Sequence, residues 1–260
     1  MCGAGADRRA PGAGADRRAP GAAPAGGSVV HHPISRDPGL GDRARQWFAD
    51  PDRVVVPARP AATVMIVRDG PRGPEVFVQR RVPTMAFAPS TVVFPGGGVD
   101  PGDHSLDPGT PGLAGLAAAM GVGAEVAVPF AAAALREVHE ECGVRLTVAD
   151  LRGLGHWVTP EFEPRRYDTW ILAAGMPPDQ QARGTTTESD HSTWVRPADL
   201  LARHASGEVR MLPPTVVSLE QLAAFGDTAT FLADRPRVAR VLPVLMETED
   251  GTLVLRTVLP

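Results

Sequence analysis

The segment Ala134–Val144, ALREVHEECGV, places three glutamates, an arginine and a histidine within six residues. Glu137, Glu140 and Glu141 stand at i, i+3 and i+4, so on a helix their carboxylates share one stripe. Carboxylates this close repel one another unless a cation or water screens them. Ligands that are all oxygen favour a hard divalent ion such as Mg²⁺ or Mn²⁺. The spacing therefore fits either a metal site or a solvated acidic helix face.

The element that must carry these glutamates is predicted to be a helix from Pro129 to Cys142. Pro129 would lie in its first turn, and Gly143 follows its end as a C-cap. His139 falls off the glutamate stripe and is expected to face solvent. Apolar residues at three- and four-residue spacings form the expected buried stripe, which consists of Ala131, Ala134, Leu135, Val138 and Cys142.

The composition limits the classes of function. A chain of 260 residues suits one domain with extensions. The net charge of −4 provides no basic footprint, so no nucleic-acid partner is expected. All 26 basic residues are arginines, which excludes a lysine Schiff base and a P-loop lysine. No apolar stretch is long enough to span a bilayer and no signal-peptide apolar region is present, so we expect a cytoplasmic protein without a membrane partner.

The two cysteines, Cys2 and Cys142, are far apart in the chain. This spacing indicates neither a disulfide framework nor a zinc site. Cys142 lies on the predicted apolar stripe of the helix, so we expect a small core residue there and not a nucleophile.

The chain begins with a low-complexity segment. The sequence GAGADRRAP occurs at 3–11 and again at 12–20, and Gly/Ala/Pro-rich chain continues to about residue 28. Because it has almost no large apolar residues, residues 1–28 are predicted to be a disordered tail. A partner-binding role for this arginine-containing tail stays open. Residues 29–53 are interpreted as a linker into the folded domain.

Residues 54–205 carry the pattern of one α/β domain. The runs ATVMIVRDG and PEVFVQRR predict a hairpin with its turn at 69–74, and TVVFPGGGVDPGD (91–103) predicts a strand running into a glycine-rich loop. GHWVTP and RRYDTWILAAG (165–175) predict another strand pair, and STWVRPADLL a strand leading into a helix. Residues 206–260 form a C-terminal extension with one or two helices between 213 and 232 and a hairpin at 249–251. This order indicates a mixed α/β sandwich.

The glycine loop and the glutamate helix together resemble the Nudix hydrolase box, GX₅EX₇REUXEEXGU, where U is a bulky apolar residue. REVHEECGV (136–144) matches the second half, and GGGVDPGD matches the first with Asp103 in place of the glutamate. Between Asp103 and Arg136 lie 32 residues where the uninterrupted box has seven, so 25 are inserted. Glu125, inside the insert, is a weaker alternative to Asp103. The resemblance implies a Nudix α/β/α sandwich with a mixed sheet, a box at 96–144 and an insert at about 104–128 that loops out.

The position of the insert is similar to that in the insertion-bearing coenzyme A diphosphatases of this family. The resemblance extends over about residues 60–225. It implies cleavage of coenzyme A or acyl-coenzyme A to 3′,5′-ADP and a 4′-phosphopantetheine species, with NADH or ADP-ribose as alternative substrates. A non-catalytic nucleotide-binding Nudix module is the alternative of another class, and the intact box carboxylates oppose it. The sequence leaves the oligomeric state open.

The resemblance also implies roles for the residues of the box. Glu137, Glu140 and Glu141 are the expected metal ligands for Mg²⁺ or Mn²⁺, with a carbonyl of Gly96 completing the metal sphere. Arg136 is expected to pair with a box carboxylate and fix its rotamer. The general base is expected either in the box or at a glutamate on a loop before a later strand. Glu188 fits the second description.

Substrate binding is assigned to residues around the box and on the neighbouring strands. A common coenzyme A signature continues from an arginine such as Arg81 with a second arginine five residues later and a glycine four beyond. Here those places hold Ala86 and Ser90. An adjacent arginine pair on a strand would point to opposite faces, so at most one of Arg165 and Arg166 is expected to reach the ligand. The full set of predicted substrate-binding residues is Arg80, Arg81, Gly97, Asp103, Arg165 and Arg166.

Overall fold

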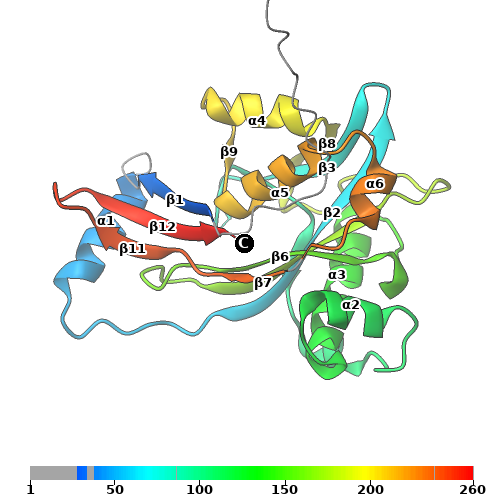
Figure 1. Ribbon diagram of the computed structural model, residues 1–260, viewed down its shortest axis with the longest axis horizontal. Helices are drawn as coiled ribbons and strands as arrows, with labels where there is room; N and C mark the ends of the chain where they lie inside the picture. The colour runs from blue at the N-terminus through cyan, green and yellow to red at the C-terminus, as the bar shows by residue number, and fades with distance from the viewer. Residues whose placement is uncertain (1–27, 34–37, 86, 237, 260) are drawn as a thin grey trace, which may run out of the picture.

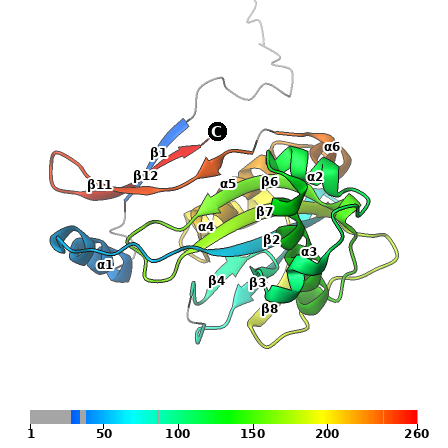
Figure 2. The same ribbon diagram turned by 90° about the horizontal axis from the view of Figure 1, so that it is seen from below.

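The structure is a computed structural model that describes residues 28–33, 38–85, 87–236 and 238–259. The predicted disordered tail therefore lies outside the described residues, except for Ser28, and so do Cys2 and Ala86. A mixed sheet forms the centre of the molecule, with helices on both of its faces (Figures 1 and 2). This arrangement is the expected α/β/α sandwich.

The central sheet has nine strands, and its main path runs β10-β6-β7-β2-β3-β4-β9. These strands are β2 (Arg59–Gly70), β3 (Gly73–Arg81), β4 (Thr91–Val93), β6 (Arg152–Val158), β7 (Tyr167–Gly175), β9 (Arg210–Met211) and β10 (Arg240–Val241). β5 (Gly96–Gly98) pairs with β2, and β8 (Ser189–Val195) pairs with β3. β2 and β3 form the predicted hairpin, while β2 runs parallel to β7. Part of the predicted glycine-rich loop is thus a short strand, β5, which pairs with the central strand β2.

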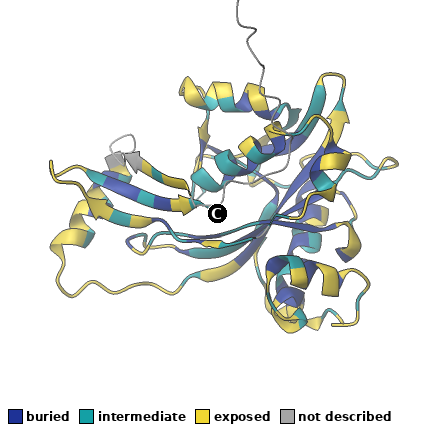
Figure 3. Cartoon of the chain, in the orientation of Figure 1, coloured by how far each residue is buried: buried dark blue, intermediate teal, exposed yellow. Residues whose placement is uncertain are grey.

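Each face of the sheet has its own hydrophobic core. The helices α2 (Leu113–Met120) and α3 (Ala124–Cys142) cover one face, and α4 (Pro197–Ala205), α5 (Pro213–Ala223) and α6 (Thr228–Ala233) cover the other. The side chains of β2 alternate between them, because successive strand residues point to opposite faces. Val64 and Ile66 join the core under α3, whereas Met65 and Val67 join the other. Figure 3 shows the buried residues concentrated along these central strands.

The box helix is longer than the sequence predicted. It begins at Ala124, and Pro129 lies inside it instead of in its first turn. Gly123 has extended backbone angles and marks the true start. A proline at the sixth position removes one backbone donor, which the helix tolerates because α3 is well packed against the sheet.

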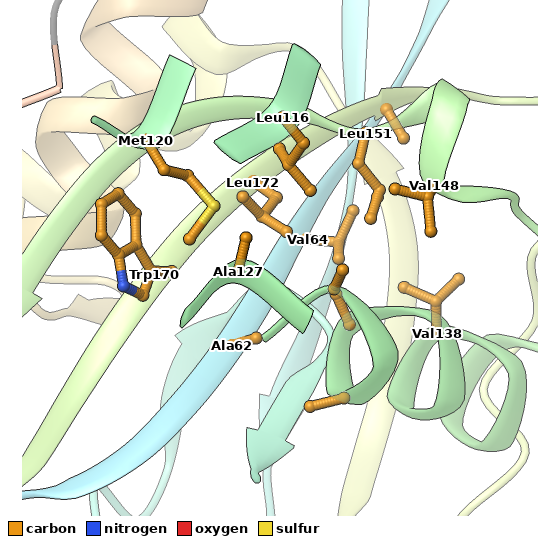
Figure 4. Packing of buried hydrophobic residues seen from close by; sticks show 14 of the residues in the cluster. Ala62, Val64, Leu116, Met120, Ala127, Val138, Val148, Leu151, Trp170 and Leu172 are labelled. Carbon is orange, nitrogen blue, oxygen red and sulfur yellow. The ribbon is translucent and has the colours of Figure 1, made fainter. Parts of the chain in front are cut away.

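The insert does not simply loop out, so that expectation is wrong. It contains α2 and the first turns of α3, and Leu113, Leu116 and Met120 are buried against the sheet. Figure 4 shows Leu116 and Met120 packed with Leu172 and Trp170 from β7. The Gly/Ala/Pro-rich composition of the insert hid this short apolar helix.

Residues 28–53, expected as a tail end and linker, contain β1 (Ser28–Pro33) and α1 (Pro38–Ala49). β1 pairs with β12 (Leu253–Leu259), which also forms the predicted C-terminal hairpin with β11 (Val244–Glu247). Ala44 of α1 packs with Phe162 and Leu255 in a small third core. The C-terminal extension therefore contributes strands as well as helices.

No single helix among the described ranges has the length and apolar character to cross a membrane. Among helix pairs in those ranges, one pair, α2 and α3, is long and apolar enough when taken together, but its two helices are bent by 105° relative to each other.

Candidate active site

The glycine strand β5 and the box helix α3 meet directly. The amide of Gly96 donates a hydrogen bond to Oε2 of Glu141 over 3.0 Å. A Cβ atom on Gly97 would lie 2.2 Å from Oε1 of Glu137. Gly96 has a φ of 153°, and a Cβ there would lie 2.4 Å from the carbonyl oxygen of Ala62. Gly96 requires glycine because its φ is positive and the backbone of β2 leaves no room for a side chain, whereas a side chain at Gly97 would displace the Glu137 carboxylate.

The three glutamates differ in burial. Glu141 is buried, with 7 % of its surface exposed, whereas the side chain of Glu140 is 54 % exposed. Burial raises the pKa of Glu141 to about 7, and the charges of Glu137 and Glu188 add to this effect. Burial also raises the pKa of Glu137, although Arg136 opposes the shift. Negative charge is therefore concentrated at a poorly hydrated position, which favours binding of a cation.

Arg136 links the two halves of the box. Its guanidinium donates to both oxygens of Asp103 over 3.1 and 3.0 Å, to Glu137 over 2.8 Å and to the carbonyl of Gly98 over 2.9 Å. The hydrogen bond to Asp103 raises the pKa of Arg136. Although burial opposes its ionisation, Asp103 has a lowered pKa because of Arg136 and the Asp100 amide. The predicted pairing of Arg136 with a box carboxylate is thus present.

The carboxylate of Asp103 is buried and engaged by other protein groups. The residue is 5 % exposed, and both of its oxygens accept hydrogen bonds from protein groups. Its predicted contact with substrate does not fit this arrangement. Glu125, the alternative partner for the helix, is exposed in the first turn of α3, far along the chain from the Arg136 turn.

The donor chemistry at the site suits a hard metal ion. Glu137, Glu140 and Glu141 offer only oxygen, and burial raises the pKa of Glu141 and of Glu137, so a divalent ion would offset the cost of their ionisation. As placed, no three His, Cys, Asp or Glu side chains in the described part of the chain converge into a metal site. Glu137 instead bonds to Arg136.

Arg81 and Glu188 border the glutamates, and Arg80 does not. The charge of Arg81 lowers the pKa of Glu141 while that of Glu188 raises it, and Gln79, two positions before Arg81 on β3, contacts the Glu141 carbonyl. The Nε of Arg81 is buried without a hydrogen-bond partner among the described residues. Arg80 instead forms an exposed pair with Asp190, at 2.7 and 3.0 Å. The register of the β3–β8 pairing shifts between Arg80 and Arg81, at the point where the surroundings of the two side chains differ.

The arginine pair after the box lies just before β7, not within a strand as expected. Arg166 is buried and donates to the carbonyls of Thr159, Pro160 and Val56 over 2.8–3.1 Å. It holds a loop together, so its predicted substrate contact does not fit. Arg165 is exposed.

Two residues from other segments contact the end of α3, and no sequence pattern indicated either of them as part of the site. Gln79 of β3 is 3 % exposed and donates to the carbonyl of Glu141 over 3.3 Å. The amide of Thr185 donates to the same carbonyl over 3.0 Å. Both contacts join segments that are distant in the chain, so no local pattern could have indicated them.

No family model matches the chain. Among solved structures, it is similar to a NUDIX hydrolase from Alicyclobacillus acidocaldarius, with 26% identity and a TM-score of 0.60 over 71% of this chain and 99% of that one. A MutT NUDIX hydrolase from Burkholderia pseudomallei aligns at 18% identity and a TM-score of 0.43, covering 64% and 98%. The NUDIX domain of Shewanella oneidensis NrtR, complexed with ADP ribose, aligns at 14% identity and a TM-score of 0.43, over 68% of this chain and 94% of that one. The first of these similarities, with the box geometry above, confirms the predicted fold: this chain has the fold of the Nudix hydrolases.

Proposed function

We propose that this chain is a metal-dependent Nudix hydrolase that cleaves the diphosphate of a nucleoside diphosphate derivative. It is an enzyme that acts on pyrophosphate bonds, as its fold and box indicate. The observation that carries the proposal is the contact of Glu141 with the Gly96 amide, beside the unpaired Nε of Arg81. Buried carboxylates next to an unsatisfied guanidinium donor fit a cation and a phosphate oxygen together.

The metal would supply charge neutralisation for the diphosphate, and Glu137, Glu140, Glu141 and the carbonyl of Gly96 would hold it. Other side chains would orient the diphosphate and accept a proton from the attacking water. Arg81 would donate to a phosphate oxygen.

Support and proton transfer are assigned to different residues. Arg136, fixed by Asp103, sets the rotamer of Glu137, and the absence of a side chain at Gly97 leaves room for that carboxylate. Glu188 would accept the proton of the attacking water. As the oxygen of that water bonds to phosphorus, the bridging P–O bond breaks, and two phosphate monoesters leave.

Within this class we propose coenzyme A or acyl-coenzyme A as substrate, giving 3′,5′-ADP and the 4′-phosphopantetheine species. The support is the branch resemblance and the loop after β3. Ser90, at the place of the signature glycine, has a φ of 55°, a left-handed conformation that glycine favours. The loop thus keeps a glycine-like backbone without the glycine. NADH and ADP-ribose are the alternative substrates.

Incubation of the purified protein with Mn²⁺ or Mg²⁺ and a panel of diphosphates, read by product mass, tests both levels of the proposal. Release of 3′,5′-ADP from coenzyme A as the preferred reaction supports the substrate. Preference for ADP-ribose or NADH contradicts coenzyme A alone. Binding of nucleotides without turnover of any would favour the non-catalytic module.

Arg165 is the remaining candidate for the 3′-phosphate of coenzyme A, because Arg166 is occupied. Arg165→Ala should raise KM for coenzyme A more than for dephospho-coenzyme A. Equal effects on the two substrates would remove Arg165 from this role. The predictions of a cytoplasmic location and of no nucleic-acid or membrane partner rest on composition and stay predictions.

A further inference from the structure

The segment 183–188 is attached to the last carbonyls of the box helix. The hydroxyl of Thr185 donates to the carbonyl of Glu140, and its amide donates to that of Glu141 over 3.0 Å. The amide of Arg183 donates to the carbonyl of Cys142 over 3.1 Å. These carbonyls have no partner within α3 because the helix ends there. The segment is therefore held against the end of the helix that carries Glu140 and Glu141.

The other end of this segment is attached to the sheet. The amide of Val82, which follows β3, donates to the carbonyl of Glu188 over 3.0 Å, and β8 starts at Ser189. The side chain of Glu188 is exposed and makes no hydrogen bond to another described residue. The backbone anchors therefore determine where the Cα atom of Glu188 lies, and with it the region that this carboxylate can reach near Glu137 and Glu141.

We propose that Thr185 is a positioning residue for Glu188. Thr185 fixes one end of the four-residue span 185–188 to the helix that would hold the metal, and Val82 fixes the other end to the sheet. Loss of the Thr185 hydroxyl would let the span shift while the fold stays intact. Misplacement of a reacting group by about 1 Å can cost on the order of 100-fold in rate. This inference rests on the proposed function, in which Glu188 is the general base.

The test compares kcat and KM for the wild-type chain and four variants, with coenzyme A and Mn²⁺ or the best diphosphate of the panel. Thr185→Val should lower kcat by about 10- to 100-fold and change KM by less than about twofold. Thr185→Ser keeps the hydroxyl and should stay within about threefold of wild type. Thr185→Ala removes the hydroxyl a second way, should valine pack poorly beside Gly143.

Thr186→Val is the matched control. The Thr186 hydroxyl is buried one position away and has no hydrogen-bond partner among the described residues, so its removal should leave kcat unchanged. A double-mutant cycle then separates mechanisms: Thr185→Val should have no further effect in a Glu188→Gln background.

Three outcomes overturn the inference. They are additive effects of Thr185→Val and Glu188→Gln, equal impairment of Thr185→Ser and Thr185→Val, and equal impairment of the Thr186→Val control. Each leaves the hydrolase assignment intact because the wild-type chain is active. A wild-type chain that hydrolyses no diphosphate overturns the proposed function itself, and the role of Thr185 with it.

Discussion

Asp103 and Arg136, 33 positions apart in the chain, form a two-point ion pair at 3.1 and 3.0 Å. Their contact joins the residues on either side of the insert. Arg136 then reaches Glu137 on its other side. The insert can be long because this pair, together with α2 in the core, fixes where it leaves and rejoins the site.

Removing one partner of this pair should affect stability and activity together. Asp103→Ala leaves Arg136 partly buried without its main acceptor, and we expect a loss of about 2–4 kcal/mol in the free energy of unfolding. kcat should fall as well, because Glu137 loses its fixed rotamer. Urea unfolding and steady-state kinetics measure the two effects. Asp103→Glu is the control, and an unchanged stability in Asp103→Ala would contradict the pair's structural role.

Glu141→Gln should lower turnover by several orders of magnitude with the fold intact. The substitution removes the most buried of the three carboxylate charges, and with it one predicted metal ligand. Assays at saturating Mn²⁺, with circular dichroism to verify folding, check this expectation. Near wild-type activity would refute the assignment of the site.

The metal-free protein should lose stability as pH rises from about 4.5 to 7. The pKa of Glu141 is about 7 in the folded chain against 4.5 ordinarily, so the folded state holds more protons in this window. Stability falls where the folded state binds the additional proton, here by roughly 3 kcal/mol at most. Urea unfolding in EDTA at several pH values measures it. Glu141→Gln should show a flatter profile, and parallel profiles would contradict the assignment.

Substitution of Arg81 should lower kcat/KM much more than substitution of Arg80. Arg81→Ala removes the guanidinium that borders Glu141 and should lower kcat/KM by about 10- to 100-fold. Arg80→Ala breaks an exposed pair with Asp190, whose contribution to stability is small, and should change kcat/KM by less than about threefold. The reverse order would show that the substrate reaches the other face of β3.

Patterns within short stretches of sequence were sufficient for much of this fold. The β2–β3 hairpin, β7 and the buried stripe of α3 follow from residues that lie close together in the chain. The shared helix face of Glu137, Glu140 and Glu141 could also be predicted locally, because a helix converts sequence spacing directly into a shared face. The start of α3 was missed since a proline near the start of a helix is normally its first residue.

The sequence by itself determined the chemistry at the site: three carboxylates on one helix, a glycine-rich loop and an arginine in the box. Only the tertiary structure decided which neighbours serve them. It assigned Asp103 instead of Glu125 to Arg136, paired Arg80 with Asp190 while the charge of Arg81 acts on Glu141, and buried the Arg166 side chain against the carbonyls of a loop. These choices depend on strand register and on contacts between distant segments. Local periodicity constrains the register of a strand only through which residues face the core, and it does not indicate which distant segment a residue will contact.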